Sequence, residues 1–199
     1  MELTVIQIIL LLGAAIDKDS DHTEVYLRIK NGDQKAFKTF FDNHHDELYR
    51  YLRQKGLAKE AAEDLIQKAF IYIWENRDSI EETKSLRAYL FRIAYTRMLN
   101  LFRDHSKFDK NQEVPDLAHT GNSADEPIHR KELNQTIENA ISSMPDKRQE
   151  VFRLCFLQEF TYKEAAETLE VSVKTIENHM GLALKDLRSS LSQAAKDYL

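Results

Sequence analysis

One segment of the chain combines a capped helix start with polar side chains that could hydrogen-bond to DNA. It runs from Thr161 to Ile176 and contains two consecutive alanines that would let two helices cross closely. Leu169, Val171 and Ile176 could form the small core of that crossing. Ser172 can cap the second helix by accepting hydrogen bonds from its free N–H groups. This order is the layout of a helix-turn-helix, whose second helix can enter a major groove.

The side chains that could read DNA lie at the start of that second helix. Lys174 can pair with a phosphate, and Asn178 and His179 can hydrogen-bond to base edges. Thr175 lies on the same side, and Lys163 of the preceding helix completes the candidate set. The alternative is an ordinary helix pair with a solvated polar face. Residues 171–199 hold four basic and three acidic side chains, so this module alone would bind DNA weakly.

A second candidate site is a basic band at residues 84–110. The chain carries a formal net charge of −5, which excludes binding to nucleic acid by bulk charge alone. The band, however, holds seven basic and two acidic residues, between acidic segments at 1–83 and 111–130. A solvated face is the alternative explanation of such a charge run. The band also contains aromatic side chains that could stack on unpaired bases: Tyr89, Phe91, Tyr95 and Phe102.

These side chains must be positioned by helices, because Gly (5) and Pro (3) are few and apolar residues recur at helical spacing. We therefore predict an all-α protein. A short helix starting near Val25 should end at Asn31-Gly32, and Asp33 should cap the next one, which ends at Gly56. The remaining predicted helices span 59–76, 85–105, 128–142, a segment opened by an Asp146–Gln149 capping box, 162–169 capped by Thr161, and 173–191 capped by Ser172.

The pattern predicts two small helical domains, 24–107 and 128–199. Between them, residues 108–127 contain Pro115, Gly121 and Pro127 with many acidic and polar residues, and they read as a flexible acidic linker. Residues 1–23 form an apolar extension of unknown role. Its apolar run of 13 residues is shorter than the roughly 20 that a membrane span needs, and it lacks the features of a signal peptide. We expect no membrane insertion.

Several kinds of chemistry are not expected. The single Cys155 excludes a disulfide framework and a multi-cysteine zinc site, and it is best explained as a small buried residue in a reducing compartment. Trp74 is best explained as a core residue. The run His44-His45-Asp46 suggests a metal-dependent phosphohydrolase, but adjacent histidines on a helix point in different directions. No phosphate-binding loop or nucleophile elbow is present. We predict a protein without enzymatic activity, metal or cofactor.

At this point three motifs, in order, resemble a known family. The segment from Met144 to Arg188 resembles the C-terminal domain of bacterial sigma factors, which contacts the minus-thirty-five promoter element. The run Asp64-Leu65-Ile66-Gln67 and the residues after it resemble the polymerase-binding helix of their N-terminal domain. The segment from Ser85 to Arg103 resembles the adjoining helix that reads and melts the minus-ten element. Two such domains with a short linker are typical of the extracytoplasmic-function group.

The resemblance implies a role for each of these regions. Asp64, Gln67, Lys68 and Ile71 would form the outer face on which the coiled coil of the polymerase clamp docks. The minus-ten contacts would be Arg87, Arg92, Tyr95, Thr96, Arg97, Arg103 and Lys107, and the minus-thirty-five contacts would be Lys163, Lys174, Thr175, Asn178 and His179. The acidic linker would run toward the RNA exit path. Implied partners are RNA polymerase core, promoter DNA and an anti-sigma factor, which in part of the family is anchored in the membrane, with the chain itself cytoplasmic.

This sequence departs from the family pattern at a few positions. Tyr95-Thr96 replaces a common Arg-Asn pair, and Lys68 replaces a common acidic residue. The run Glu177-Asn178-His179 resembles the branch common in Bacteroidetes, which is regulated by membrane anti-sigma proteins. A different class is the alternative: residues 172–179 also resemble the output helix of response-regulator and quorum-sensing transcription regulators. Those proteins need an upstream α/β domain, whereas residues 24–107 show helical periodicity throughout.

Overall fold

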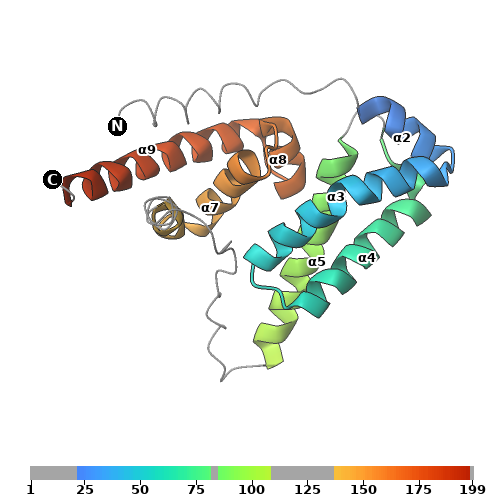
Figure 1. Ribbon diagram of the computed structural model, residues 1–199, viewed down its shortest axis with the longest axis horizontal. Helices are drawn as coiled ribbons and strands as arrows, with labels where there is room; N and C mark the ends of the chain where they lie inside the picture. Colours follow the sequence, from blue (N-terminus) through green and yellow to red (C-terminus); the bar gives the residue numbers. More distant parts are fainter. Residues whose placement is uncertain (1–21, 82–84, 109–136, 198–199) are drawn as a thin grey trace, which may run out of the picture. The chain divides into compact units, whose positions relative to one another are not determined.

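Within the parts of the chain that the computed structural model describes, residues 22–81, 85–108 and 137–197, all regular structure is helical (Figure 1). The all-α prediction is therefore confirmed. The helices form two compact units, an N-terminal one built on α2 to α5 and a C-terminal one built on α7, the first part of α8, and α9. The predicted extension (1–23) and linker (108–127) lie almost entirely outside the described residues. None of the described helices is long and apolar enough to span a membrane.

The N-terminal unit contains α2 (His22–Lys30), α3 (Gln34–Gln54), α4 (Lys59–Glu75), a single 3-10 turn η1 (Arg77–Ser79) and α5 (Leu86–Phe108). The stop and cap residues predicted from the sequence lie at the ends of its helices. Gly32 and Gly56 follow α2 and α3 with φ of +81° and +91°, a conformation that glycine adopts without strain. Asp33 caps α3 by accepting hydrogen bonds from the backbone N–H groups of Lys35 and Ala36. These hydrogen bonds lower the pKa of Asp33 below its ordinary value.

One apolar face of each N-terminal helix turns into a shared core. Leu48 and Leu52 of α3, Ile73 of α4 and Leu90 of α5 are fully buried. Tyr26 of α2 donates its hydroxyl hydrogen bond to the carbonyl of Ile80, and so ties the first helix to the chain after η1. This core holds α4 and α5 against α3 and leaves their opposite faces available for binding.

A cluster of aromatic rings joins α3 to α4. The ring centroid of Phe37 lies 4.9 Å from that of Trp74 and 6.2 Å from that of Phe70, and Phe40 and Phe70 are 5.7 Å apart. Trp74 is half-buried in this cluster and also carries the guanidinium of Arg77 over its ring at 4.8 Å. These contacts agree with the prediction that Trp74 is a packing residue. Phe41, at the edge of the cluster, is partly exposed.

The C-terminal helices are a segment at 137–142, α7 (Asp146–Phe152), a π-helical turn η2 (Arg153–Leu157), α8 (Tyr162–Leu169), which belongs to the C-terminal unit as far as Ala166, and α9 (Val173–Asp197). Helix α7 packs along α9 through Val151, Phe152, Ile176 and Met180, all of which are buried. Arg148 of α7 forms an ion pair with Asp186 of α9. Helix α9 extends six residues beyond the predicted end at 191.

The predicted capping box at the start of α7 is wrong. Pro145, not Asp146, occupies the N-cap position, and no side chain caps the helix. Proline has no N–H group, so the reciprocal hydrogen bond of a capping box cannot form there. The Gln149 amide instead donates to the carbonyls of Met144 at 2.8 Å and Ser142 at 3.1 Å.

The helix-turn-helix core also differs from the prediction at one position. Ile176 is fully buried and Leu169 half-buried, but Val171 is 41% exposed. The turn between α8 and α9 explains this difference. Glu170 adopts φ +55°, and the N–H of Val171 donates back to the carbonyl of Ala166, a helix-closing bond that leaves the Val171 side chain pointing outward.

Candidate functional site

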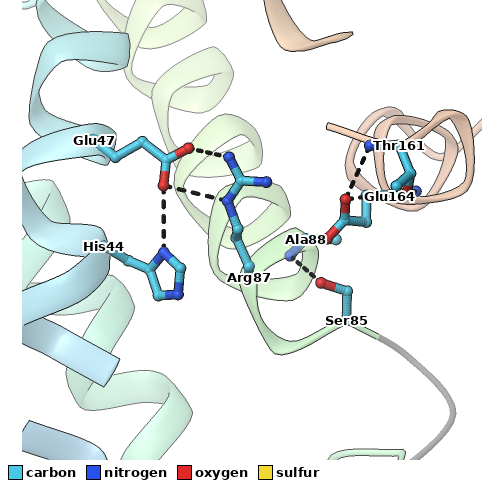
Figure 2. A network of polar contacts seen from close by, with 7 residues as sticks. All are labelled: His44, Glu47, Ser85, Arg87, Ala88, Thr161 and Glu164. Atoms are coloured by element: carbon cyan, nitrogen blue, oxygen red, sulfur yellow. Dashed lines mark hydrogen bonds and ion pairs between the residues drawn. The ribbon is translucent and has the colours of Figure 1, made fainter. Parts of the chain in front are cut away.

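The start of each helix in the helix-turn-helix is fixed by side-chain caps. The backbone N–H of Thr161 donates to the carboxylate of Glu164 at 3.0 Å, and the N–H of Glu164 donates to the Thr161 hydroxyl at 3.2 Å (Figure 2). This is a capping box, of which the Glu164 half was not predicted. At the start of α9, the N–H of Thr175 donates to the Ser172 hydroxyl at 3.1 Å, as predicted. The caps define where the first turn of α9 presents its side chains.

The five residues predicted to read DNA in this unit lie in different environments. Lys174 and Asn178 are exposed one turn apart on α9, and Lys163 is exposed on α8. Thr175 is half-buried, and its hydroxyl lies 2.8 Å from that of Ser172. The ion pair between Glu177 and Lys174, at 2.9 Å, was not predicted. Because this carboxylate neutralises part of the lysine charge, it competes with a phosphate for Lys174.

His179 differs from the other four because it is partly packed against its own unit. Its Nδ1 atom is buried and has no hydrogen-bond partner among the described residues. Only the other edge of the ring can therefore reach a ligand. This geometry lets His179 offer Nε2 to a base edge or a phosphate.

The basic band lies along α5, and most of its predicted DNA contacts are accessible. Thr96 and Arg103 are exposed, and Arg92, Tyr95 and Arg97 are half-buried. The guanidinium of Arg92 lies over the Tyr89 ring at 5.5 Å, and that of Arg97 lies over the Tyr72 ring at 5.6 Å. The side chain of Lys107 lies outside the described residues.

Two aromatic residues of the band lie in opposite environments, although both were expected to receive bases. Phe91 is fully buried and packs 5.3 Å from the Tyr51 ring, so that expectation is wrong for it. Phe102 is 38% exposed and remains accessible to a base. Burial raises the pKa of Tyr89, which remains half-exposed with Tyr95.

Arg87 has a different environment from the other basic residues of α5. Its side chain is 14% exposed and forms an ion pair with Glu47 of α3, whose other bond is to Nδ1 of His44 at 3.3 Å (Figure 2). Burial alone would raise the pKa of Glu47, but the hydrogen bonds from His44 and Arg87 outweigh it and lower that pKa. The expectation that Arg87 faces DNA does not agree with this geometry, because its guanidinium is already engaged inside the unit.

The predicted docking face on α4 is exposed as a continuous strip. Asp64, Gln67, Lys68 and Ile71 all lie on the surface, and Ile71 is 47% exposed. Asp64 and Lys68 form an ion pair at 2.7 Å across one helical turn. The opposite face of α4 is buried through Leu65, Ala69 and Ile73. The helix thus has one face in the core and an exposed face that is mixed apolar and charged, where a partner was predicted to bind.

An open groove of about 440 Å³ lies between this strip and the basic band. Its walls are the side chains of Asp64, Leu65, Lys68, Arg97, Asn100, Leu101 and Asp104. Asn100 and Asp104 were missed as site residues, although they follow Arg97 at helical spacing and therefore share its face. The groove places the two predicted surfaces of the N-terminal unit side by side.

The residues that could have suggested metal or thiol chemistry have other environments in the described part of the chain. No group of three or more His, Cys, Asp or Glu side chains within them could hold a metal ion. His44 and His45 each contact a neighbouring carboxylate of α3, Glu47 and Asp46. Cys155 is buried, and burial followed by the charge of Glu164 raises its pKa to about 12. Such a thiol is not a nucleophile at neutral pH.

Comparison with known proteins places both units in one family. Residues 40–108 match Sigma-70 region 2, and residues 134–187 match Sigma-70, region 4. The ECF RNA polymerase sigma factor SigW of Bacillus subtilis is 28% identical over 175 residues, covering 82% of this chain and 93% of that protein. The chain belongs to the extracytoplasmic-function (ECF) RNA polymerase sigma factors.

Solved structures of sigma factors share the fold. CnrH in complex with the cytosolic domain of CnrY matches with a TM-score of 0.61 and 23% identity over 86% of this chain and 97% of that one. The sigma factor RpoE in complex with the anti-sigma factor NepR from Bartonella quintana matches with a TM-score of 0.63 and 20% identity over 79% and 98%. These two structures support the fold, whereas the family matches and the similar proteins confirm the sigma-factor interpretation and do not favour the response-regulator alternative.

Proposed function

We propose that this ECF sigma factor uses three exposed helix faces for three tasks. The strip Asp64, Gln67, Lys68 and Ile71 on α4 docks on the clamp coiled coil of RNA polymerase core. The outer face of α5, with Arg92, Tyr95, Thr96, Arg97 and Arg103, binds and opens the minus-ten element. The first turns of α9, with Lys174, Thr175, Asn178 and His179, and Lys163 of α8, read the minus-thirty-five element.

The observation that carries the proposal is the separation of these faces from the cores that support them. Each helix buries one side, and the named residues lie exposed or partly exposed on the other, so binding requires no unpacking of the cores. The basic side chains of α5 are interleaved with accessible aromatic rings, which suits phosphate contact and base stacking together. The groove of about 440 Å³ between α4 and α5 lies next to both the docking strip on α4 and the face of α5 that we propose to open the minus-ten element.

The overall charge supports a requirement for polymerase. With a formal net charge of −5, the chain lacks the electrostatic attraction that holds most independent DNA-binding proteins on DNA. Core polymerase supplies the missing affinity, and the sigma factor supplies the choice of site. We propose the cytoplasm as its place of action, with the domain boundaries 24–107 and 128–199 and a linker at 108–127.

An anti-sigma factor is the proposed regulator. Two of the solved relatives are described as complexes with CnrY and with the anti-sigma factor NepR, and both match most of this chain. The run Glu177-Asn178-His179 supports placement in the Bacteroidetes-like branch, whose anti-sigma partners are anchored in the membrane. The exposed strip on α4 is a surface that such a partner could cover to keep polymerase away.

Transcription in vitro tests the proposal. Core polymerase and fragmented genomic DNA are incubated with and without the full chain, and the 5′ ends of the transcripts are mapped. We expect a new set of start sites that share two upstream sequence elements. An unchanged set of 5′ ends would contradict the proposal. Adding an anti-sigma factor that covers the α4 strip to the same assay should return the set of 5′ ends to that of core polymerase alone.

A further inference from the structure

Gly181 of α9 lacks an intramolecular reason to be glycine. It lies in the middle of a long helix, where glycine is less favourable than alanine because it gains no side-chain contacts and costs more backbone entropy. A Cβ atom built at this position would meet nothing within 4 Å, and its φ is not in the left-handed region. Neither crowding nor backbone conformation therefore requires glycine here.

The position of Gly181 on the helix suggests what does require it. At about 100° per residue, Lys174, Asn178, Gly181, Lys185 and Arg188 lie within about 40° of one line along α9. This line, which we call the outer stripe, is opposite the buried face formed by Ile176, Met180, Ala183 and Leu187. All five residues of the stripe are on the surface, and Figure 1 shows α9 as one uninterrupted helix.

The charge of the outer stripe is of one sign. It carries three cations and no carboxylate over about 21 Å, in a chain that is acidic overall. The nearest acidic residues of α9 are Glu177, about 60° away and paired with Lys174, and Asp186, which is paired with Arg148 of α7. Within the described part of the chain, neither Lys185 nor Arg188 forms an ion pair. The stripe is therefore complementary to a polyanion.

We propose that the sugar–phosphate backbone of the promoter crosses the outer stripe at Gly181, and that Lys185 and Arg188 bind its phosphates. A straight helix inserted by its first turns leaves the curved major groove further along its length, so its later turns meet the groove's edge. Glycine keeps the helix surface low at that crossing, and the two cations follow it at one-turn intervals. The inference rests on the proposed DNA-reading role of the first turns of α9.

Substitutions at Gly181 should change promoter affinity and thermal stability in opposite directions. Gly181→Ala and Gly181→Gln should each raise the melting temperature of the full chain by a few degrees, because both residues favour helix and their Cβ atom meets no neighbour within 4 Å. The same variants should weaken promoter binding, by several-fold for alanine and by roughly tenfold or more for the longer glutamine. If the variants are more stable and still bind the promoter as tightly as the parent chain, the DNA backbone does not pass close to Gly181.

Substitutions of the two cations test the phosphate contacts. Holoenzyme formed from core polymerase and each full-length variant is titrated onto a promoter fragment identified by the transcription assay, at several salt concentrations. Lys185→Gln and Arg188→Gln should each reduce the slope of log affinity against log salt by about 1. Lys147→Gln removes the same charge from an exposed site on α7, off the stripe, and should leave the slope unchanged.

Two further measurements, on Lys174→Gln and on binding of core polymerase, show which part of the proposal is wrong if the predicted effects are absent. Lys174→Gln should weaken promoter binding if the proposed reading turn is correct. If it does, while the Gly181, Lys185 and Arg188 variants bind DNA normally, only the extended crossing is wrong. If Lys174→Gln also has no effect, the DNA-reading role of α9 itself is wrong. Normal DNA binding combined with weaker binding of core polymerase by the stripe variants would assign the stripe to a protein partner and overturn the proposal.

Discussion

The basic residues of α5 fall into two groups. Some side chains pack the helix against its own unit, and others extend into solvent. Arg87 is turned inward to Glu47, and this carboxylate is also bonded to His44. Arg103, sixteen residues later, has a 63% exposed side chain. The same residue type therefore has two environments on one helix. Glu47 and Arg87 fix the first turn of α5 against α3, and the remaining turns carry the face that we propose to bind DNA.

Glu47→Gln should lower the free energy of unfolding at pH 7 by about 2–4 kcal/mol, because it leaves Arg87 buried without its charge partner. Folding lowers the pKa of Glu47, so its ionised form stabilises the folded state. That contribution is complete above its ordinary value of 4.5 and is lost as the pH falls through the lower folded value. Urea unfolding followed by circular dichroism should show the difference shrinking in acid. A difference that is constant across this range would exclude the ion pair as its cause.

Arg87→Gln and Arg103→Gln should affect promoter binding in different ways. Both remove one positive charge from α5, but only Arg103 is placed to contact a phosphate. For holoenzyme on a promoter fragment, Arg103→Gln should flatten the salt dependence of log affinity by about one unit, and Arg87→Gln should leave that slope unchanged. Measurement well below the melting temperature keeps both variants folded. If both variants flatten the salt dependence equally, Arg87 also contacts DNA.

At the scale of the elements, most helices could be predicted because local signals mark their ends. Gly32, Gly56, Asp33 and Ser172 act through bonds within one or two turns, and the structure uses each of them as expected. The start of α7 was predicted wrongly because two signals overlap there, and proline removes the N–H that the capping box needs. The π-helical turn Arg153–Leu157 was not predicted, because its hydrogen-bond shift leaves no local mark in the sequence.

The candidate site was less predictable than the helices. Exposed positions one turn apart, such as Asp64 and Lys68, follow directly from periodicity. The burial of Arg87 depends on Glu47, forty residues earlier, and no local pattern reports a contact of that range. The groove between α4 and α5 has the same origin, since its walls come from two helices. Long-range pairing is therefore the part that sequence reasoning could not supply.

Thr161→Ala tests the capping box that begins α8. The substitution removes the hydroxyl that accepts from the Glu164 N–H, and it should lower the free energy of unfolding of the C-terminal unit by about 1 kcal/mol. Thr161→Ser keeps the hydroxyl and should retain most of that stability. Thermal unfolding of the three proteins provides the comparison. Equal losses in both variants would show that the methyl group, not the cap, is responsible.

At the scale of the whole molecule, the distribution of charge explains why two binding units occur in one chain. Neither the basic band of α5 nor the outer stripe of α9 outweighs the formal net charge of −5. A weak contact at each promoter element becomes specific when a larger enzyme holds both units on the same DNA, since the second contact then forms at high effective concentration. In this proposal, the strip on α4 is the contact with polymerase on which the arrangement depends.

Asp64→Lys should lower the affinity for core polymerase by roughly tenfold while the chain remains folded. The Asp64–Lys68 ion pair is exposed, so its loss costs little stability, whereas charge reversal in a docking face opposes a complementary partner. Asp46→Lys makes the same change on an exposed position of α3, outside the strip, and serves as the control. Quantitative pull-down with core measures the affinity. Equal binding by both variants would place the docking face elsewhere.

The central claim is that the chain selects promoters only as part of polymerase holoenzyme. The most direct measurement is the affinity of the full chain for a labelled promoter fragment, alone and with core, at physiological salt and in excess non-specific DNA. We predict that binding with core is at least about a hundredfold tighter and that it is reduced by both Asp64→Lys and Lys174→Gln. Promoter binding by the chain alone that is as tight as binding by the holoenzyme would contradict the account.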